Sequence, residues 1–316
     1  MIPRRLRRPR ALRAGGALAL CLALVPLAAQ GQAWLPPKGT FSYSIDYTDI
    51  LNKKHFGYPG CVLPDGTSCS GEADVGHTDN QVLSFSASYS PTDRISINAS
   101  LPYVRTRHRD NDPTPDSHDT PIDDGSWHST ITDLQFTVNY QLVTGAFGLA
   151  PYVGAVIPTH DYTTFGHSAP GRGLNEYWVG AYAAMSLNEW IPRTYVQLRG
   201  NYAFVEEVLD IAHDRINAVL EIGYFPTPRW NLRAIYSQQW TEGGINVPIP
   251  VTDPRFPYHD QLVAEEFKAL GGGATWVINE RVSVYAFYLQ HLDGTNAHKV
   301  DHRVSTGVSY GLGGHH

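Results

Sequence analysis

The chain has 316 residues, of which 42% are hydrophobic, and its 24 basic and 30 acidic side chains give a formal charge of −6. This acidic balance argues against nucleic acid as a partner, because binding to phosphates depends on a basic surface. Beyond residue 33, no window has 18 consecutive apolar residues, so no spanning helix is expected there.

Residues 1–33 have the pattern of a signal peptide. Six arginines between Arg4 and Arg13 precede an apolar stretch, and Gly31-Gln32-Ala33 offers small residues where a signal peptidase reads. The alternative is a membrane anchor, but about 16 apolar residues fall short of the roughly 20 that a spanning helix needs. Without this segment, 18 basic and 30 acidic residues leave a formal charge of −12. Residues 34–316 show no linker-like composition and are expected to form one domain.

Strict alternation of apolar and small polar residues begins in Thr40–Thr48 and continues in Gln81–Tyr89 and Ile95–Tyr103. Successive side chains of a strand point to opposite faces, so one face carries residues such as Phe85 and the other carries residues such as Ser86. The polar face consists of Ser and Asn rather than the Lys and Glu that are common in soluble sandwiches. This pattern favours a barrel wall with lipid outside and a wet interior.

The long segment between the first two strands contains Cys61 and Cys69, which flank a Pro-Asp-Gly turn. An exported protein with an even cysteine count and such a turn is predicted to close this loop with a disulfide. A metal site would need a second pair of ligands, which the sequence does not offer nearby.

Nine further strands follow the charged loop 105–129. The predicted ranges are 133–142, 149–158, 176–187, 195–204, 216–224, 230–240, 266–276, 282–292 and 303–312. Short and long connections alternate along the chain, and aromatic residues such as Tyr89, Trp230 and Trp276 collect at strand ends. These features predict an all-β, transmembrane antiparallel β-barrel of about twelve strands in the bacterial outer membrane, with short periplasmic turns and long extracellular loops. Its expected partners are outer-membrane lipid, lipopolysaccharide and the barrel assembly machinery.

The same alternation places a few charged residues inside the predicted barrel. Arg199, Glu221 and Arg233 face the lumen, together with Asn201 and Asn231. A turn centred on Thr227 would set Glu221 directly opposite Arg233, and a loop centred near Asp210 would set Arg199 level with Glu221, near mid-height. Two interpretations stay open: the row braces a narrow lumen, or it selects solutes as charged side chains do in channels.

Enzyme and metal signatures are sparse. The sequence has no G-x-S-x-G or HExxH motif, and most histidines, among them His55, His167 and His298, fall in predicted outside loops. We therefore predict no catalytic residue, no metal ligand and no cofactor. Two alternatives were weaker: a pair formed by His291 and His302 across the last hairpin, and a divalent cation in the acidic stretch 110–124, which lacks the calcium-loop pattern.

Three short motifs resemble an outer-membrane family named for the meta-pathway of phenol degradation, whose members are often called transporters. They are Leu101-Pro102-Tyr103, Thr132-Asp133-Leu134 and Ile157-Pro158-Thr159. The chain departs from that family at His160, where Gly is usual, and in the Gly-rich end after Tyr310. The resemblance spans most of the chain in layout, and it implies uptake of aromatic or other hydrophobic compounds.

Together these features predict a barrel that passes small-molecule solutes without catalysis or energy coupling. Two rival functions stay open: a closed structural or adhesive barrel that acts through its loops, and an outer-membrane barrel enzyme.

Overall fold

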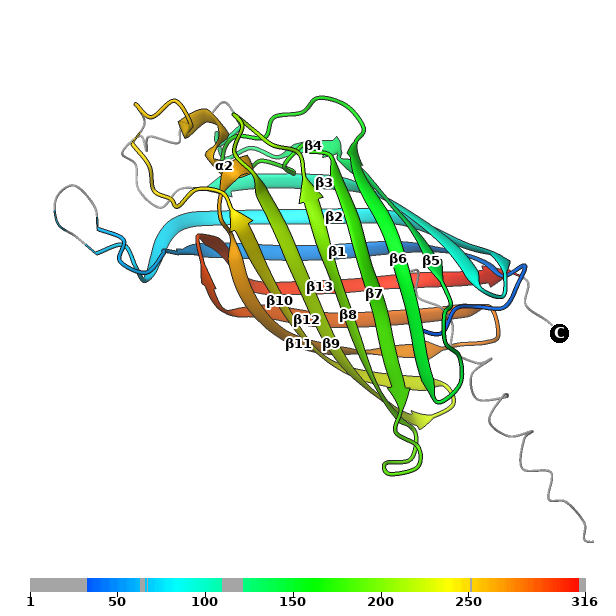
Figure 1. The fold of residues 1–316 in the computed structure, drawn as a ribbon. Coiled ribbons are helices and arrows are strands. Elements are labelled where there is room, and N and C mark those ends of the chain that lie inside the picture. Colours follow the sequence, from blue (N-terminus) through cyan, green and yellow to red (C-terminus); the bar gives the residue numbers. More distant parts are fainter. Residues whose placement is uncertain (1–32, 63–65, 67, 110–121, 251, 313–316) are drawn as a thin grey trace, which may run out of the picture.

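The computed structural model describes residues 33–62, 66, 68–109, 122–250 and 252–312. Its strands form one antiparallel sheet that closes into a barrel of twelve wall strands (Figure 1), which confirms the predicted fold. The sheet closes because β3 pairs with β2 on one side and with β4 and β5 on the other. The strands are β1 (Phe41–Phe56), β2 (Glu72–Thr92), β3 (Ile95–Arg109), β4 (His128–Ile131), β5 (Asp133–Tyr140), β6 (Phe147–Pro158), β7 (Glu176–Ser186), β8 (Thr194–Val205), β9 (His213–Thr227), β10 (Trp230–Gly243), β11 (Glu266–Val277), β12 (Val282–Thr295) and β13 (Ala297–Leu312).

β4 and β5 are two parts of one wall strand. Both pair with β3, and the break between them lies at Thr132, close to Pro102 of β3. Proline has no backbone N–H, so it cannot donate to the neighbouring strand. The N–H of Thr132 still donates to the Pro102 carbonyl at 3.0 Å, which keeps the wall hydrogen-bonded across the break.

Each of the twelve predicted strands is present, but several run further toward the long loops than the alternation indicated. β1 continues to Phe56 and β3 to Arg109, through residues that the sequence placed in loops. These extensions carry polar and charged residues on both faces, so they do not show the alternation. They lie beyond the lipid, where water solvates such side chains. A short 3-10 helix, η1 (Phe256–Tyr258), and one helical turn, α2 (His259–Leu262), lie in the connection between β10 and β11.

The two faces of the wall differ as the alternation predicts. On β1 the outward residues Tyr43 and Ile45 are 44% and 42% exposed, whereas the inward Ser44 is 2% exposed. Inward hydroxyl groups bond across strands, as in the 2.9 Å contact between Ser86 and Ser100. The inward side chains of β1, β2 and β3 are therefore mostly small and polar, and they fit a narrow barrel of twelve strands.

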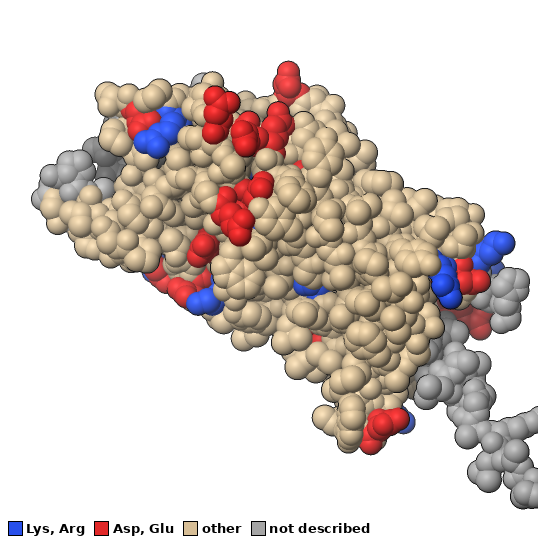
Figure 2. Space-filling view, viewed as in Figure 1, with Lys and Arg blue, Asp and Glu red and all other residues tan. Residues whose placement is uncertain are grey.

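Charged side chains gather toward the two ends of the barrel, and the band between them is almost free of charge on the face in Figure 2. The indole rings of Trp230 and Trp276 stack at 5.9 Å at the short-turn end, and both are exposed. An apolar band with aromatic rings at its edge is typical of a wall that faces lipid. Among the described residues, no helix is long and apolar enough to span a membrane.

Cys61 and Cys69 form a disulfide with a Cα–Cα distance of 4.9 Å in the connection between β1 and β2. The expected signal peptide lies, apart from Ala33, outside the described residues, as do most of the acidic stretch 110–124 and the last four residues of the chain.

The lipid-facing assignment can be tested at Leu220, which points outward from β9 between Leu198 and Tyr236. We expect Leu220→Arg to lower the free energy of unfolding by about 2–4 kcal/mol, because a charge facing hydrocarbon is poorly solvated. Urea unfolding in liposomes measures this change. Leu209→Arg, at an exposed loop position, is the control and should leave stability unchanged; equal effects of both changes would contradict the assignment.

Candidate functional site

The charged residues predicted for the lumen lie on the inward face of three consecutive strands. Arg199 is on β8, Glu221 on β9 and Arg233 on β10. Their outward neighbours are exposed, with Leu198 at 50% and Leu232 at 44%. The side chains of Arg233 and Glu221 are only 10% and 14% exposed, so these charges lie inside the barrel.

The predicted register of this row is wrong by two residues at both connections. Glu221 pairs with Ile235 of β10 rather than with Arg233, and with Gln197 of β8 rather than with Arg199. On the β9–β10 side, Thr227 pairs with Trp230, so the turn is centred past Thr227, and the bulge between Trp230 and Leu232 then brings the offset to two residues. An even shift leaves every side chain on its predicted face, because the side-chain period of a strand is two. Arg233 lies only three residues after Trp230, so it is nearer the short turns than mid-height.

Long side chains bridge the two-residue offset. A guanidinium nitrogen of Arg233 lies 3.6 Å from the Glu221 carboxylate. The hydroxyl of Tyr195 donates to the same carboxylate at 2.5 Å and accepts from the amide of Asn231 at 3.2 Å. Arg233 also donates to the Thr275 hydroxyl at 2.8 Å. We call Tyr195, Arg199, Glu221, Asn231 and Arg233 the lumen belt.

Aromatic rings accompany the two arginines of the lumen belt. The guanidinium of Arg233 lies 4.2 Å from the ring centre of Phe287, a distance at which cation–π attraction operates. Arg199 pairs across strands with Tyr182, whose ring lies 5.1 Å from that of Tyr152. Neither these aromatic residues nor Tyr195 was predicted to face the lumen. Extending the alternation from Leu198 back to Tyr195 would have placed Tyr195 there, since residues three apart in a strand face opposite sides.

Asn201 is also on the inward face of β8, two residues from Arg199 and paired with Asn217 of β9. It therefore lies on the extracellular side of the lumen belt. The five predicted lumen residues thus share one face of the wall, and their role in selecting solutes stays a prediction.

A segment before β1 enters the barrel near the short turns. The backbone N–H of Leu35 donates to the Gln141 side chain at 2.6 Å, and the indole N–H of Trp34 donates to the Gly145 carbonyl at 3.0 Å. The indole of Trp34 also meets the ring of Tyr195 edge-on at 6.3 Å. Trp34 and Leu35 pack against a cluster that includes Tyr152 and Tyr182. The lumen is therefore narrowed at this end by backbone from outside the strands.

Loops cover the opposite end. Arg172, in the connection between β6 and β7, donates to Glu265 at 2.5 Å, and Gln261 donates to the Arg172 carbonyl at 2.7 Å. In the same connection, Tyr162 donates to Asp133 at 2.5 Å, and burial together with this hydrogen bond raises the pKa of Tyr162. These contacts hold the β6–β7 and β10–β11 connections together over the mouth of the barrel.

Two further alternatives from the sequence were a pair formed by His291 and His302 and a divalent cation site in the acidic stretch 110–124. His291 stacks on Phe267 at 4.4 Å, whereas His302 lies 3.5 Å from Asp49 on the other face of the wall, so these histidines do not form the suggested pair. In the described end of the acidic stretch, Asp123 accepts two backbone N–H groups of residues 167 and 168, and hydrogen bonds from Ser126 and His128 lower the pKa of Asp124. These carboxylates already have protein partners.

The expectation that His55 and His298 belong to outside loops is wrong. Both lie in strands, in the last part of β1 and the first part of β13, and they pair with each other across the wall. The sequence did not reveal this, because the strands continue through polar segments that break the alternation.

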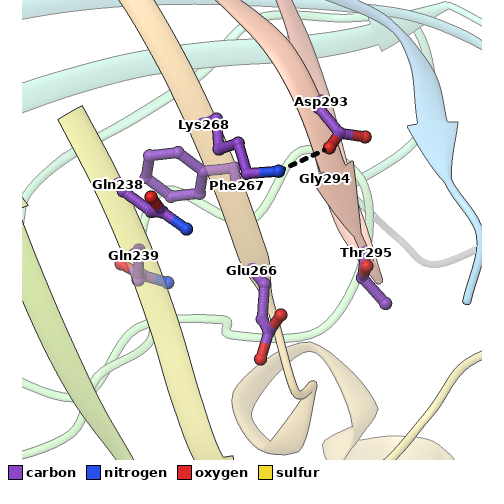
Figure 3. Close-up of a pocket in the computed structure, with 8 residues that line it drawn as sticks. All are labelled: Gln238, Gln239, Glu266, Phe267, Lys268, Asp293, Gly294 and Thr295. Atoms are coloured by element: carbon purple, nitrogen blue, oxygen red, sulfur yellow. Dashed lines mark hydrogen bonds and ion pairs between the residues drawn. The ribbon is translucent and has the colours of Figure 1, made fainter. Parts of the chain in front are cut away.

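A shallow polar recess lies at the loop-side ends of β10, β11 and β12 (Figure 3). The ammonium of Lys268 and the carboxylate of Asp293 form a 3.0 Å ion pair across it. These two charged groups are therefore paired with each other, and Glu266 is a third charged residue of the lining. Its lining residues are Gln238, Gln239, Glu266, Phe267, Lys268, Asp293, Gly294 and Thr295.

Comparison with known proteins identifies the architecture. No protein-family model matches the sequence, and no curated protein is significantly similar to it, so the resemblance to the phenol meta-pathway family stays a prediction. Among solved structures, an outer-membrane channel from Pseudomonas putida F1 is similar over 90% of this chain and 99% of its own, with 16% identity and a TM-score of 0.67. The NanC porin (8% identity, 85% and 100% covered, TM-score 0.49) and a TodX monoaromatic hydrocarbon channel mutant (12%, 88% and 91%, 0.44) are more distant.

At 16% identity, the likeness to the Pseudomonas channel concerns the fold alone, and the two lower scores carry no argument. Together with the apolar outer face and the closed twelve-strand sheet, it identifies the chain as a β-barrel of the bacterial outer-membrane type.

The hydroxyl of Tyr195 is the centre of the lumen belt, and its removal tests whether the belt stabilises the barrel. We expect Tyr195→Phe to lower the free energy of unfolding by about 1–3 kcal/mol, because Glu221 and Asn231 each lose a hydrogen-bond partner away from bulk water. Urea unfolding followed by tryptophan fluorescence measures this. Tyr177→Phe, an outward residue of β7, is the matched control. If both changes have the same effect, the belt does not contribute in this way.

Proposed function

We propose that the chain is a passive outer-membrane channel for small molecules, in particular aromatic or hydrophobic compounds that carry a negative charge. The observation behind this proposal is the lumen belt, in which two arginines and one glutamate lie inside a narrow barrel. Burying a charge costs free energy, and small polar or apolar side chains could brace the lumen equally well, so bracing alone does not require charged residues there. A charged ring at a constriction is a recurrent means of selecting solutes.

The aromatic part of the proposal rests on the residues beside the arginines. Phe287 is partly exposed beside Arg233, so an aromatic solute could stack there while its anionic group meets the guanidinium, whereas Tyr152 and Tyr182 are buried beside Arg199. The resemblance to the phenol meta-pathway family points to the same class of compound. The similar structure from Pseudomonas putida is itself described as an outer-membrane channel, which agrees with the proposal.

The mechanism is diffusive. A solute enters between the extracellular loops, passes the lumen belt and leaves past the segment at Trp34 and Leu35. No catalytic step is part of the proposal. In the membrane, the outward face would contact lipid and lipopolysaccharide, and the barrel assembly machinery would insert the chain.

A closed structural or adhesive barrel is the second candidate. It is favoured by the loops that cover the extracellular mouth and by the segment at Trp34 and Leu35 at the other end, which both narrow the lumen. The two candidates differ in whether the folded barrel conducts ions.

Single-channel recording in planar bilayers with a salt gradient tests the channel. We expect a steady current with a preference for anions, because the lumen belt carries one more positive than negative charge. Arg199→Ala and Arg233→Ala should each lower the anion-to-cation permeability ratio about 2- to 10-fold, since one charge in a wet, narrow lumen contributes on the order of 1 kcal/mol. Glu221→Gln should raise the ratio.

Arg229→Ala is the control for this experiment, because Arg229 is an exposed residue of the short turn between β9 and β10 and lies outside the lumen belt. The anion-to-cation permeability ratio of this variant should match that of the unmodified protein. Complete absence of current would favour the closed barrel. Identical anion-to-cation permeability ratios in all variants would show that the lumen belt does not determine ion selectivity.

Paired solutes of equal charge test the aromatic preference. We expect liposomes that contain the barrel to take up benzoate faster than cyclohexanecarboxylate, and Phe287→Leu to reduce this difference because a stacking face beside Arg233 is lost. Tyr288→Leu, on the lipid-facing side of the same strand, should preserve it. Equal uptake of both solutes by the unmodified protein would leave a hydrophobic rather than an aromatic specificity.

A further inference from the structure

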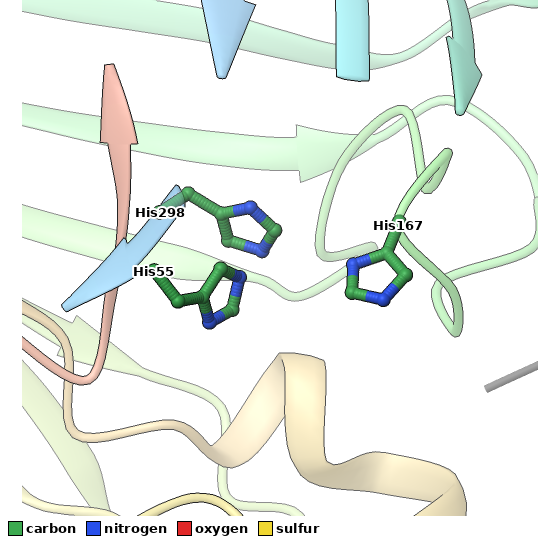
Figure 4. A group of neighbouring side chains, drawn as sticks. All are labelled: His55, His167 and His298. Atoms are coloured by element: carbon green, nitrogen blue, oxygen red, sulfur yellow. The ribbon is translucent and has the colours of Figure 1, made fainter. Parts of the chain in front are cut away.

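Three histidines from distant parts of the chain converge beneath the extracellular loops. His55 is near the end of β1, His298 is near the start of β13, and His167 lies in the connection between β6 and β7. Figure 4 shows the rings of His55 and His298 pointing toward that of His167. One ring nitrogen of each residue lies within 4.8 Å of those of the other two.

Two irregularities in the wall turn His55 and His298 inward. Between Leu51 and Lys54 the pairing of β1 with β13 shifts twice, leaving one unpaired residue on each strand, Lys53 and Asp301. An extra residue reverses the alternation beyond it, so side chains that would face outward face the lumen instead. His55 and His298 then pair directly, with ring centres 3.8 Å apart.

The third histidine is positioned from the other side. The backbone N–H of His167 donates to Asp123 at 3.0 Å, and its ring stacks on that of His108 of β3 at 4.3 Å. His108 is buried and its Nδ1 lies 2.9 Å from the Thr78 hydroxyl. The loop is thus anchored on β3 and on the β3–β4 connection, and β2 separates β3 from β1, which carries His55.

The chemistry of this group is that of a transition-metal site. Imidazole suits Zn²⁺ and its neighbours in the first transition series, whereas Ca²⁺ and Mg²⁺ take oxygen ligands. Zn–N bonds of about 2.0–2.1 Å in a tetrahedral site bring ring nitrogens to about 3.4 Å from one another, so small side-chain rotations would suffice. Arg172 acts electrostatically on this group, but it is paired with Glu265, which offsets its charge.

We propose that His55, His167 and His298 bind a divalent transition-metal ion such as Zn²⁺, with the fourth position open to water or another ligand. The ion would join the β6–β7 connection to the wall formed by β1 and β13. It would thereby fix a loop over the extracellular mouth.

Metal binding by the folded, full-length barrel in detergent tests the proposal. Equilibrium dialysis with Zn²⁺ and elemental analysis should give one bound ion per chain, and Co²⁺ should give the visible absorption of a tetrahedral site. His55→Gln, His167→Gln and His298→Gln should each weaken Zn²⁺ binding about tenfold or more. His302→Gln, at the rim beside Asp49, is the matched control and should bind as the unmodified protein does.

A second readout addresses the loop itself. Zn²⁺ should protect the 159–175 connection from limited proteolysis in the unmodified protein and in His302→Gln, but not in His167→Gln. The heat-dependent gel shift of a folded barrel verifies that each variant has folded. The proposal would be overturned if the unmodified protein failed to bind Zn²⁺ or Co²⁺, or if all three site variants bound Zn²⁺ as tightly as the unmodified protein.

Discussion

Closure of the sheet is the constraint on which the rest of the molecule depends. Inside a bilayer no water can satisfy backbone N–H and C=O groups, so a sheet must leave no open edge. Here β3 completes the ring by pairing with β2 on one side and with β4 and β5 on the other. Even at the break between β4 and β5, the Thr132 N–H donates a hydrogen bond to the Pro102 carbonyl. Once the ring is closed, alternation along every strand divides the side chains between lipid and lumen.

The lumen belt follows from this division. Its residues come from neighbouring strands, so their relative heights depend on the turns that connect those strands. Whether each side chain faces lipid or lumen depends only on the two-residue period of its own strand. Arg233 reaches Glu221 across a two-residue offset because an arginine side chain is long, and Tyr195 fills the space between. The site therefore tolerates a shift in register that would separate shorter side chains.

The same reasoning explains what the sequence could predict. The twelve strands and the inward face of Arg199, Glu221 and Arg233 follow from local alternation, which each strand carries on its own. Register could not be predicted, because the centre of each connection is not visible in the alternation: both connections of β9 are centred away from the assumed residue, and a bulge near Trp230 adds a further shift. The histidine group was missed for a related reason: its members are separated by more than a hundred residues, and two of them face inward only because of unpaired residues.

Those unpaired residues have a consequence for how such a barrel can change. Lys53 and Asp301 lie on opposite strands at nearly the same height, and the pairing of β1 with β13 resumes beyond them in the register it had before. The two insertions cancel, so the stagger of the barrel, and with it the diameter and tilt of the membrane part, need not change. Compensated insertions of this kind let the rim acquire new inward residues while the lipid-facing wall stays as it was.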